Sequence, residues 1–522
     1  MQTSKIIRIA SRGSELALWQ AHFVQQELQR AGFASEIKII KTQGDKIQHL
    51  SLDKLEGKGF FTKEIEDALL NDEADLAVHS HKDLPTESPE ELVIAAVSYR
   101  EDPSELLLVR PEAYDAKLRF GFRAGAVLGT SSARRKSQLL AFRPDIELKD
   151  LRGNVPTRVQ KLRDGQYDAI LLAAAGIERL KLNLEGLHVE KLDPREFVPA
   201  PAQGVLALQT RAGDKELIAA LQKIHHRDVQ ECIAVERKVL NLFEGGCHLP
   251  LGCYCTKEED VFFAWAAMAE SWDKTPRLIH VETKKGEGLA GRIVEKLRSI
   301  KPCRVFITRH LRKNDPFVNL LRGNGFKVDG QALIEMKAVP FKEVPKADWI
   351  FFSSKHAVRY FLQQAKIPAG AKIAAVGKAT AQELRAHDLR ADFIGQDGDT
   401  RLTGKKFAAL AGRAAVLFPQ AKGSLRSIQQ QAPAAKIINL IVYETIRHPV
   451  EELPDADIVV FTSPSNVEAW FEKRKISAKQ KVVAMGHATA SALQEHGIRA
   501  HAQPATFDDT GLAQAVFGLA AK

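Results

Sequence analysis

The sequence predicts an α/β protein with several domains, and three observations lead to this prediction. Short apolar runs alternate with stretches of helical periodicity over roughly the first 210 residues. The chain is 522 residues long, which is more than one hydrophobic core usually contains. Its C-terminal part repeats a set of short motifs at a constant spacing. Alternating strands and helices form mostly parallel sheets, which bind ligands in the loops at the ends of their strands.

Composition and charge exclude several classes of protein. A content of 45% hydrophobic and 27% charged residues indicates a globular chain. No stretch approaches the ~18 uninterrupted apolar residues of a membrane span, and residues 1–10 lack the apolar core of a signal peptide. Five cysteines do not make a disulfide framework in so long a chain. We therefore expect a cytoplasmic protein that binds no membrane.

The formal net charge of +10 indicates an anionic partner. Arginine and lysine lie singly or in pairs inside turn motifs, without the long basic run and interleaved aromatics that single-strand binders use. The charge therefore favours a polyanionic small molecule over nucleic acid.

The strands and helices of the N-terminal part follow one another in two units. The first unit starts with a strand at 6–11 and a helix at 14–30, whose apolar residues are Leu16, Trp19, Phe23 and Leu28. It continues with a strand at 37–41, a helix at 62–70 and a strand at 75–79. The second unit has a strand at 126–129, a helix at 133–142 and a strand at 169–173.

Residues 215–300 form a smaller mixed segment. Its predicted elements are a helix at 229–242, a strand at 261–267 and a helix at 288–300. Lys301-Pro302 ends the last helix, and a strand at 304–308 follows directly. Two regions are thus joined without a Gly/Ser-rich linker.

Past this junction the chain repeats itself with an offset of 109 residues (358 to 467, 377 to 486 and 384 to 493). The motif Phe352-Ser353-Ser354-Lys355-His356-Ala357-Val358 recurs as Phe461-Thr462-Ser463-Pro464-Ser465-Asn466-Val467. The motif Gly377-Lys378-Ala379-Thr380-Ala381 recurs as Gly486-His487-Ala488-Thr489-Ala490. A duplication without a change of register predicts two similar α/β lobes, and the cleft between them is a natural ligand site.

The loop Glu244-Gly245-Gly246-Cys247-His248-Leu249-Pro250-Leu251-Gly252 places one thiol on a sharply turned, accessible backbone. A thiolate with cationic neighbours can anchor a group covalently. The alternative is a small apolar residue at a turn. A zinc site with Cys253, Cys255 and His248 is disfavoured, because the spacing lacks the usual C-x2-C knuckle. Cys232 and Cys303 are expected to be small buried residues.

Two further motifs are typical of anion sites. Gly129-Thr130-Ser131-Ser132 joins a strand to a helix N-terminus, and Arg134 and Arg135 follow it with planar donor groups that match carboxylates. Leu151-Arg152-Gly153-Asn154 repeats this arrangement, with Arg158 one turn into the next helix. The alternatives are plain helix caps with solvated arginines, and surface salt bridges, more so for Arg158 than for Arg152.

Asp83 follows Lys82 at the end of a predicted strand. A carboxylate beside a cation usually stays ionised, which suits it to hold a developing positive charge or to move a proton. The alternative is an exposed turn aspartate. His79 and His81 alternate and would face one side of the strand, but no third metal ligand lies nearby, so no metal site is expected.

In this order and spacing, four stretches resemble hydroxymethylbilane synthase, also called porphobilinogen deaminase. They are the Cys247 loop, Val78-His79-Ser80-His81-Lys82-Asp83, Gly129-Thr130-Ser131-Ser132-Ala133-Arg134-Arg135, and Leu151-Arg152-Gly153-Asn154-Val155-Pro156-Thr157-Arg158. The resemblance covers about residues 5–300. It implies two periplasmic-binding-protein-like α/β lobes and a small α+β domain. Lobe 1 would comprise residues 1–102 with 197–214, lobe 2 residues 103–196, and the cofactor-carrying domain residues 215–300.

The resemblance also implies an activity. The family joins porphobilinogen molecules head to tail with release of ammonia, and then hydrolyses the linear product, hydroxymethylbilane, from its primer. The primer would be a dipyrromethane cofactor bound to Cys247 through a thioether, with no metal. Asp83 would stabilise the cation formed on deamination and assist proton transfer.

Other roles follow from the match of motifs. Residues implied to bind the cofactor are Cys247, Lys82, Asp83, Ser131, Arg134, Arg135 and Arg152. Residues implied to bind substrate are Arg12, Ser14, Arg158, Arg179 and Gln203, the last near the hinge. Lys54, Lys58 and Phe61 would lie on a flap over the site.

Residues 302–522 resemble uroporphyrinogen-III synthase, a bilobal α/β family that inverts the last pyrrole ring and closes the macrocycle. The support is the internal repeat together with Val442-Tyr443-Glu444-Thr445. The resemblance implies that Tyr443 is a general acid for loss of the terminal hydroxyl. Thr380, Ser463 and Thr489 would hold carboxylates, but each fits a turn or cap equally well.

The leading hypothesis is thus a bifunctional enzyme of haem synthesis, acting on small molecules and expected to be a monomer. In a second hypothesis the C-terminal region is a non-catalytic partner domain. In a third the chain is an anionic-solute-binding protein, which the anchored thiol argues against, since a simple binder needs none.

Overall fold

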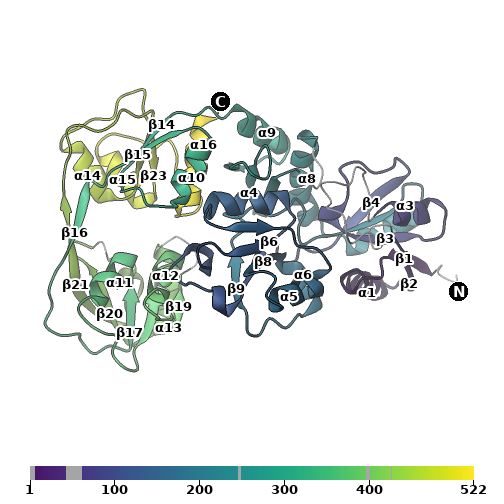
Figure 1. Cartoon of the computed structure of the whole chain (residues 1–522), viewed down its shortest axis with the longest axis horizontal. Helices are drawn as coiled ribbons and strands as arrows, with labels where there is room; N and C mark the ends of the chain where they lie inside the picture. The colour runs from purple at the N-terminus through teal and green to yellow at the C-terminus, as the bar shows by residue number, and fades with distance from the viewer. Residues whose placement is uncertain (1–5, 43–61, 245–248, 396–399, 425, 522) are drawn as a thin grey trace.

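The structure is a computed structural model, which describes residues 6–42, 62–244, 249–395, 400–424 and 426–521. Five sheets organise this described part of the chain. Figure 1 shows lobes 1 and 2 on the right and in the centre, a smaller third domain above them, and two further lobes on the left. The predicted α/β class is confirmed.

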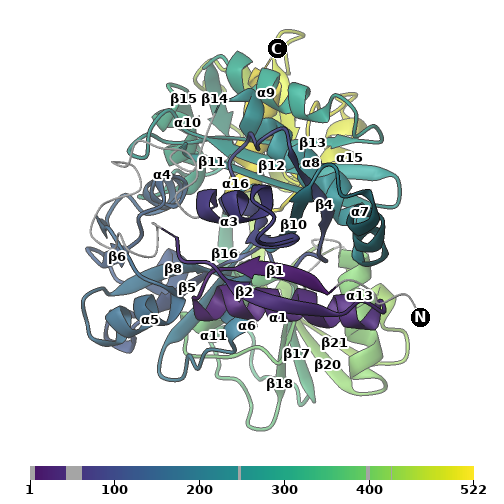
Figure 2. The same cartoon turned by 90° about the vertical axis from the view of Figure 1, so that its right-hand side faces the viewer.

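Lobe 1 is built on a mixed sheet of order β2-β1-β3-β10-β4. Its strands are β1 (Ile7–Ser11), β2 (Ser35–Ile39), β3 (Leu76–Ser80), β4 (Leu92–Val97) and β10 (Leu206–Arg211), and its helices are α1 (Glu15–Arg30) and α3 (Lys63–Leu70). Strands β1, β2, β3 and β4 share one direction and β10 alone runs against β3 and β4, so the sheet is mixed but mostly parallel, as predicted. Helices α1 and α3 lie on opposite faces of the sheet (Figure 2).

Lobe 2 repeats this plan with the order β7-β6-β8-β5-β9. Its elements are β5 (Glu105–Val109), β6 (Val127–Gly129), α4 (Ala133–Phe142), β7 (Glu147–Lys149), α5 (Val155–Arg163), β8 (Ala169–Ala173), α6 (Ala174–Leu180) and β9 (His188–Leu192). Strand β5, where the chain first enters lobe 2, is antiparallel to both of its neighbours, β8 and β9. Helix α4 and strand β8 begin and end where the sequence predicts them.

The third domain packs an antiparallel sheet of order β11-β12-β13 against two helices. Its elements are α8 (Arg227–Leu242), β11 (Leu251–Glu258), β12 (Val261–Met268), β13 (Arg277–Thr283) and α9 (Leu289–Ser299). The preceding helix α7 (Lys215–Leu221) instead packs into lobe 1, where Leu217 and Leu221 join the apolar core. Cys232 is buried as predicted, but Cys303 is only half-buried, so that prediction is wrong.

The C-terminal region consists of lobes A and B. Lobe A contains β14 (Arg304–Ile307), α10 (Pro316–Gly323), β15 (Lys327–Gly330), β22 (Ile458–Phe461), α14 (Pro464–Phe471), β23 (Lys481–Ala484), α15 (His487–Glu495) and α16 (Asp509–Ala520). Lobe B contains β16 (Ile334–Ala338), β17 (Trp349–Phe352), α11 (Lys355–Leu362), β18 (Lys372–Ala375), α12 (Lys378–Arg385), β19 (Phe393–Ile394), α13 (Thr400–Ala411), β20 (Ala415–Ala421) and β21 (Lys436–Arg447). The chain leaves lobe A through β16 and returns through β21, and these two strands pair with each other.

The internal repeat is confirmed, and each copy forms the same strand–helix–strand–helix unit in its own lobe. The first copy runs through β17, α11, β18 and α12, and the second runs through β22, α14, β23 and α15. Their caps also correspond, because Ser354 and Ser463 each accept a hydrogen bond from the backbone N–H three residues on. No helix among the described residues is long and apolar enough to cross a membrane.

Candidate functional site

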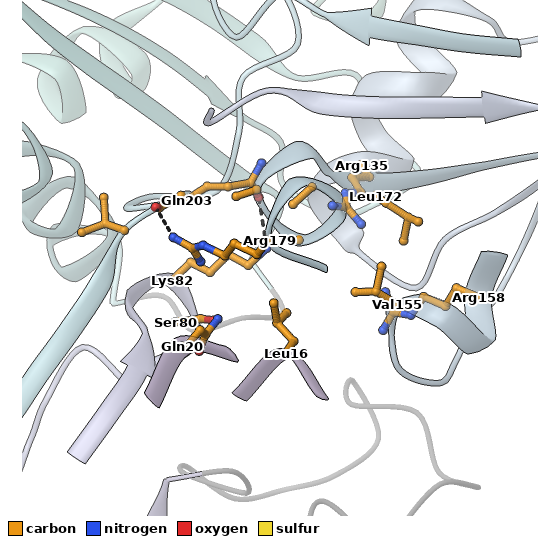
Figure 3. A pocket seen from close by; sticks show the side chains of 15 residues that line it. Leu16, Gln20, Ser80, Lys82, Arg135, Val155, Arg158, Leu172, Arg179 and Gln203 are labelled. Carbon is orange, nitrogen blue, oxygen red and sulfur yellow. Dashed lines mark hydrogen bonds between the residues drawn. The ribbon is translucent and has the colours of Figure 1, made fainter. Parts of the chain in front are cut away.

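A cavity of about 110 Å³ lies between lobes 1 and 2 (Figure 3). Of the predicted site residues, Lys82, Arg135, Arg158, Arg179 and Gln203 line it. Lobe 1 contributes Lys82 from the turn after β3, while Arg135, Arg158 and Arg179 come from the helices α4, α5 and α6 of lobe 2. The turn after β3 and the helices α4, α5 and α6 therefore bring four cations from distant parts of the sequence to one site.

Gln203 and Lys82 join the two lobes at the back of this cavity. Lys82 Nζ donates to Gln203 Oε1 at 3.2 Å, and Gln203 Nε2 donates to the carbonyl of Pro103 at 2.8 Å. Gln203 is fully buried and lies on the segment that returns from lobe 2 to lobe 1. Burial lowers the pKa of the Lys82 ammonium group, which Asp83 and Glu105 partly offset.

Glu105 is the site residue that the sequence analysis missed. This fully buried carboxylate accepts from Arg134 Nη2 and from Arg135 Nη2, each at 2.6 Å. Burial by itself would raise the pKa of Glu105, but the two guanidinium groups outweigh it and lower the pKa to about 2. An acidic residue at the head of the apolar run Leu106–Val109 was the only sequence signal for it.

The buried cations of lobe 2 are held by backbone carbonyls as well. Arg134 Nη1 donates to Val198 O at 2.9 Å, and Arg179 Nη2 donates to Gly204 O at 2.7 Å. Burial lowers the pKa of Arg179, and burial together with Arg135 and Arg152 lowers the pKa of Arg158 to about 10. The structure does not support the surface salt bridge considered for Arg158, because this residue lines the cavity.

Asp83 is exposed and lies in the short 3₁₀ helix η1 (His81–Asp83), beside the cavity. Its charge acts on Lys82 of lobe 1 and on Arg158 of lobe 2, so it faces the same interlobe space. His79 and His81 do not share one strand face as predicted, because β3 ends at Ser80. His79 Nε2 instead forms a buried hydrogen bond with Gln209 Oε1 at 3.0 Å.

Four further predicted residues are described by the structure but do not line the cavity. Ser14 caps α1, and Ser131 ties the two anion motifs together by accepting from Leu151 N at 3.1 Å and donating to Leu151 O at 3.0 Å. Arg12 and Arg152 are half-buried on the loops that follow β1 and β7. Cys247, Lys54, Lys58 and Phe61 lie outside the described residues.

The third domain is bound to the hinge between the lobes through Glu236 of α8. Arg100 Nη1 donates to Glu236 Oε1 at 2.6 Å, and the backbone N–H of Ala202 donates to Glu236 Oε2 at 2.6 Å. Arg100 and Ala202 lie on the two segments that connect the lobes. Arg237, on the same helix, donates to the carbonyl of Leu84 at 3.0 Å and so holds the end of α8 beside Asp83. Helix α8 leads directly into the Cys247 loop.

Two buried thiols of the third domain are poorly suited to react as thiolates. Cys253 and Cys255 are buried on β11, and burial raises the pKa of Cys253 well above its usual value. Cys255 also has a raised pKa, through its contact with Cys232 and through burial. Both thiols therefore stay protonated at neutral pH.

In the C-terminal region Tyr443 lies on β21 of lobe B, where it is nearly buried. Its hydroxyl is 3.3 Å from Ser354 Oγ, the cap of α11, and its ring stacks on Tyr360. Burial raises the pKa of Tyr443, so the phenol keeps its proton at neutral pH. Thr380 and Thr489 are equivalent buried residues in the first turns of α12 and α15, and Ser463 caps α14.

Cations that the sequence analysis did not single out lie between lobes A and B. Burial lowers the pKa of Lys355, at the start of α11, and repulsion from Arg312 of lobe A lowers it further. Arg312 and Arg309 both pair with Asp509 at 2.9 Å. Lys355 directly follows Ser354, so the interlobe surface near Tyr443 is cationic.

Two α/β lobes around a cavity lined by four cations are typical of proteins that bind small anionic molecules. Residues 7–219 match the family model described as porphobilinogen deaminase, dipyromethane cofactor binding domain, and residues 315–514 match that of uroporphyrinogen-III synthase HemD. The chain belongs to the porphobilinogen deaminase family and carries a uroporphyrinogen-III synthase domain at its C-terminal end.

Relatives of known activity match the N-terminal half of the chain. It is 44% identical over 252 residues to a porphobilinogen deaminase of Bacillus subtilis, covering 48% of this chain and 79% of that protein. It is 46% identical over 260 residues to the porphobilinogen deaminase of Nitratidesulfovibrio vulgaris strain DP4, covering 49% of this chain and 80% of that protein.

Solved structures match the C-terminal half. A uroporphyrinogen-III synthetase from Helicobacter pylori is 19% identical with a TM-score of 0.31, covering 41% of this chain and 98% of that one. A mutant uroporphyrinogen III synthase from Thermus thermophilus is 21% identical with a TM-score of 0.31, covering 42% of this chain and 98% of that one.

Proposed function

We propose that the cavity between lobes 1 and 2 holds the dipyrromethane primer and the incoming porphobilinogen, with Cys247 as the anchor of the primer. The observation that carries this proposal is the set of four cations around one interlobe cavity, of which Arg135 and Arg179 are buried. The Nε atoms of Arg135 and Arg179 are buried without a hydrogen-bond partner, and both residues line the cavity. Such donors fit the acetate and propionate carboxylates of pyrrole rings.

Dipyrromethane, when bound, supplies a nucleophilic terminal pyrrole to which the chain grows. Arg135, Arg158 and Arg179 orient carboxylates, and the half-buried Lys82 is held in place by its hydrogen bond to the buried Gln203. Asp83 stabilises the cation left when ammonia departs, and accepts or returns a proton at the pyrrole nitrogen. Arg12 and Ser14 are proposed to bind substrate, and Ser131, Arg134 and Arg152 the primer, although Arg134 also holds Glu105 and Val198 O.

The sheets support the proposed domain boundaries. Lobe 1 comprises residues 1–102 with 197–214, lobe 2 residues 103–196, the cofactor-carrying domain residues 215–300, and the synthase region residues 302–522. The packing of α7 on lobe 1 favours moving the start of the cofactor-carrying domain to the region after this helix.

In the synthase region, Tyr443 is proposed to protonate the terminal hydroxyl of hydroxymethylbilane as it leaves. Its neutral phenol and its contact with Ser354 suit it to this role. Thr380, Ser463 and Thr489 are proposed to hold substrate carboxylates with hydroxyl and backbone donors at helix N-termini. We further propose a cytoplasmic monomer, in keeping with the free thiols of the four described cysteines.

The deciding experiment supplies purified protein with porphobilinogen, oxidises the products and separates uroporphyrin isomers I and III. Isomer III is expected to dominate, because the synthase region inverts the last ring before spontaneous closure. Tyr443→Phe is expected to shift the product to isomer I, whereas the matched control Tyr360→Phe keeps isomer III. Isomer I from the unaltered chain would contradict the synthase activity.

The anchor is tested by Cys247→Ser in the full chain. This variant is expected to fold and to form no hydroxymethylbilane, and mass spectrometry is expected to find no bound dipyrromethane. Full turnover, or an adduct on another residue, would contradict the assignment of Cys247.

A further inference from the structure

Lobe A of the synthase region is fastened to the deaminase region through an apolar interface. Helix α10 packs on α4 of lobe 2, and α16 lies against β13 of the third domain. One continuous apolar cluster spans both regions and includes Phe142, Leu278, Phe317, Leu321 and Phe517. An interface of this kind resembles a core and holds lobe A as a rigid extension of the deaminase region.

Close backbone approach and polar contacts complete this interface. Asn319 Nδ2 donates to Ala141 O at 3.3 Å, and Asn324 Nδ2 donates to Pro276 O at 3.2 Å. A side chain at Gly323 would meet Thr275 Oγ1 at 2.2 Å, so only glycine allows α10 to lie this close to the third domain.

Lobe B meets the deaminase region in a different way. Among the described residues, no lobe B residue belongs to the apolar cluster. Its contacts are ion pairs from α12: Lys378 Nζ lies 3.1 Å from Asp193 Oδ2, and Arg385 Nη1 lies 3.8 Å from Glu190 Oε2. The side chains of Lys378 and Arg385 are 67% and 48% exposed, so water and salt weaken these pairs.

The deaminase residues at this contact form one short stretch, residues 190–196, which we call the docking segment. Its Glu190 and Asp193 face lobe B, whereas Arg195 and Glu196 reach α16 of lobe A. Gln514 Nε2 donates to Arg195 O at 2.9 Å, and Thr510 Oγ1 donates to Glu196 Oε1 at 3.2 Å. In Figure 1 lobe 2, which carries this segment, lies beside both lobes of the synthase region.

The docking segment is itself well ordered by internal contacts. Asp193 accepts from Arg195 Nη2 at 2.7 Å and from the Arg195 backbone N–H at 3.0 Å. The side chain of Asp193 is only 14% exposed, and these contacts together with Lys378 hold its pKa well below the usual value despite burial. Asp193 therefore presents a fixed negative charge to α12.

The connection between lobes A and B allows them to move relative to each other. Two chain crossings join them, through β16 and β21. Lobes linked by two such segments can open and close as rigid bodies. A strong interface on lobe A and a weak one on lobe B therefore leave lobe B as the part that moves.

We propose that the docking segment of the deaminase region binds both synthase lobes and controls how far lobe B opens. Lobe A stays attached, while the pairs of Lys378 with Asp193 and of Arg385 with Glu190 hold lobe B in the closed position. Because α12 begins at Lys378 and carries Thr380, this contact also positions the proposed substrate-binding turn. The proposed effect on substrate binding rests on the proposed synthase function. The contact between the docking segment and lobe B does not.

The test reverses both charges of lobe B in the full chain, as Lys378→Glu with Arg385→Glu. Small-angle X-ray scattering is expected to give a larger radius of gyration than for the unaltered protein. The KM for supplied hydroxymethylbilane is expected to rise about three- to tenfold, since weak pairs shift a two-state equilibrium by this order. The rate of hydroxymethylbilane formation from porphobilinogen is expected to stay unchanged, which also shows that the variant folds.

The matched control reverses two exposed lysines of lobe B on the segment between β16 and β17, as Lys342→Glu with Lys346→Glu. This control has the same change of net charge and is expected to behave as the unaltered protein. An equal radius of gyration and an equal KM in the two double variants would overturn the proposal.

A charge swap tests the pairing directly. Glu190→Lys combined with Arg385→Glu is expected to restore much of the compact scattering profile that Arg385→Glu alone loses. A further opening in the combined variant would overturn the assignment of this pair. If the unaltered chain makes no isomer III, the proposed synthase function fails, yet the scattering comparison still decides whether the docking segment holds lobe B.

Discussion

Glu105 shows how one residue organises the cationic site. It lies fully buried between Arg134 and Arg135, and each oxygen accepts from a different guanidinium group. Arg134 is thereby committed to a structural contact with Glu105 and Val198, whereas Arg135 still lines the cavity with a free Nε. A buried ion pair of this kind positions Arg135, the arginine proposed to bind the ligand, more than a comparable apolar contact would stabilise the fold.

Removal of the Glu105 charge tests whether the two buried arginines depend on this carboxylate. Glu105→Gln leaves two buried arginines without their anion, and is expected to lower the free energy of unfolding by about 3–5 kcal/mol. Urea unfolding measures this change. The matched control Asp150→Asn breaks the exposed pair with Lys136 and is expected to cost less than ~1 kcal/mol. Equal losses in the two variants would contradict the structural role of Glu105.

Asp83 is expected to matter for the reaction and little for stability, because its side chain is exposed. Asp83→Asn removes the charge proposed to stabilise the pyrrole cation that remains when ammonia departs, and is expected to lower kcat for porphobilinogen about 10²–10⁴-fold. The rate of ammonia release measures the effect. Asp164→Asn, on the exposed end of α5, serves as the control and is expected to keep its activity. A fall in thermal stability matching the fall in activity would argue for a structural role instead.

At the scale of elements, the short span from β3 to η1 carries two buried histidines. Burial lowers the pKa of His79 to about 4, and burial with the nearby Arg237 lowers the pKa of His81 to about 4. Both histidines are therefore neutral in the folded protein at neutral pH. This span holds Lys82 and Asp83 in the site, so the charge state of the histidines affects the site through the fold.

These pKa values predict acid lability. Each folded-state pKa lies below the unfolded value, so each histidine stabilises the fold above about pH 6.5, and this contribution is lost as pH falls toward 4. Lowering the pH from 7 to 5 is expected to reduce the free energy of unfolding by about 2 kcal/mol for each histidine. Urea midpoints at the two pH values measure the loss, and His79→Gln is expected to reduce it. An unchanged pH dependence in that variant would contradict the assignment.

The repeated units of lobes A and B show how far local sequence determines an element. Strands β17 and β22 and helices α11 and α14 keep the offset of the sequence repeat at both of their ends. Helices α12 and α15 start at the same offset but end one residue apart. The serine caps and the glycines before α12 and α15 explain the common starts, because capping is a local interaction.

At the scale of the whole molecule, the two enzymes share an apolar cluster. Phe317 of α10 is fully buried in it, close to the end of α4, the helix that carries Arg134 and Arg135. The deaminase site and the synthase lobe A are therefore coupled through one packed interface.

The shared cluster predicts joint unfolding of lobe A with the deaminase region. Phe317→Ala is expected to cost about 3–5 kcal/mol and to lower the temperature at which deaminase activity is lost. Phe407→Ala removes a fully buried phenylalanine of lobe B and serves as the control, because this residue belongs to a separate cluster. Calorimetry combined with residual-activity assays measures both variants. Equal heat inactivation of the deaminase in the two variants would contradict the coupling.

The sequence by itself determined the α/β class, the order of the units, the internal repeat and the cations that line the interlobe cavity. These follow from periodicity, capping and motif spacing, which act over short stretches of chain. The tertiary structure alone decided the antiparallel direction of β5 and β10, the burial of Glu105 between two arginines, and the docking of the synthase lobes. Each of these depends on pairing between residues far apart in the chain, and a buried ion pair or interface leaves no local pattern from which it can be predicted.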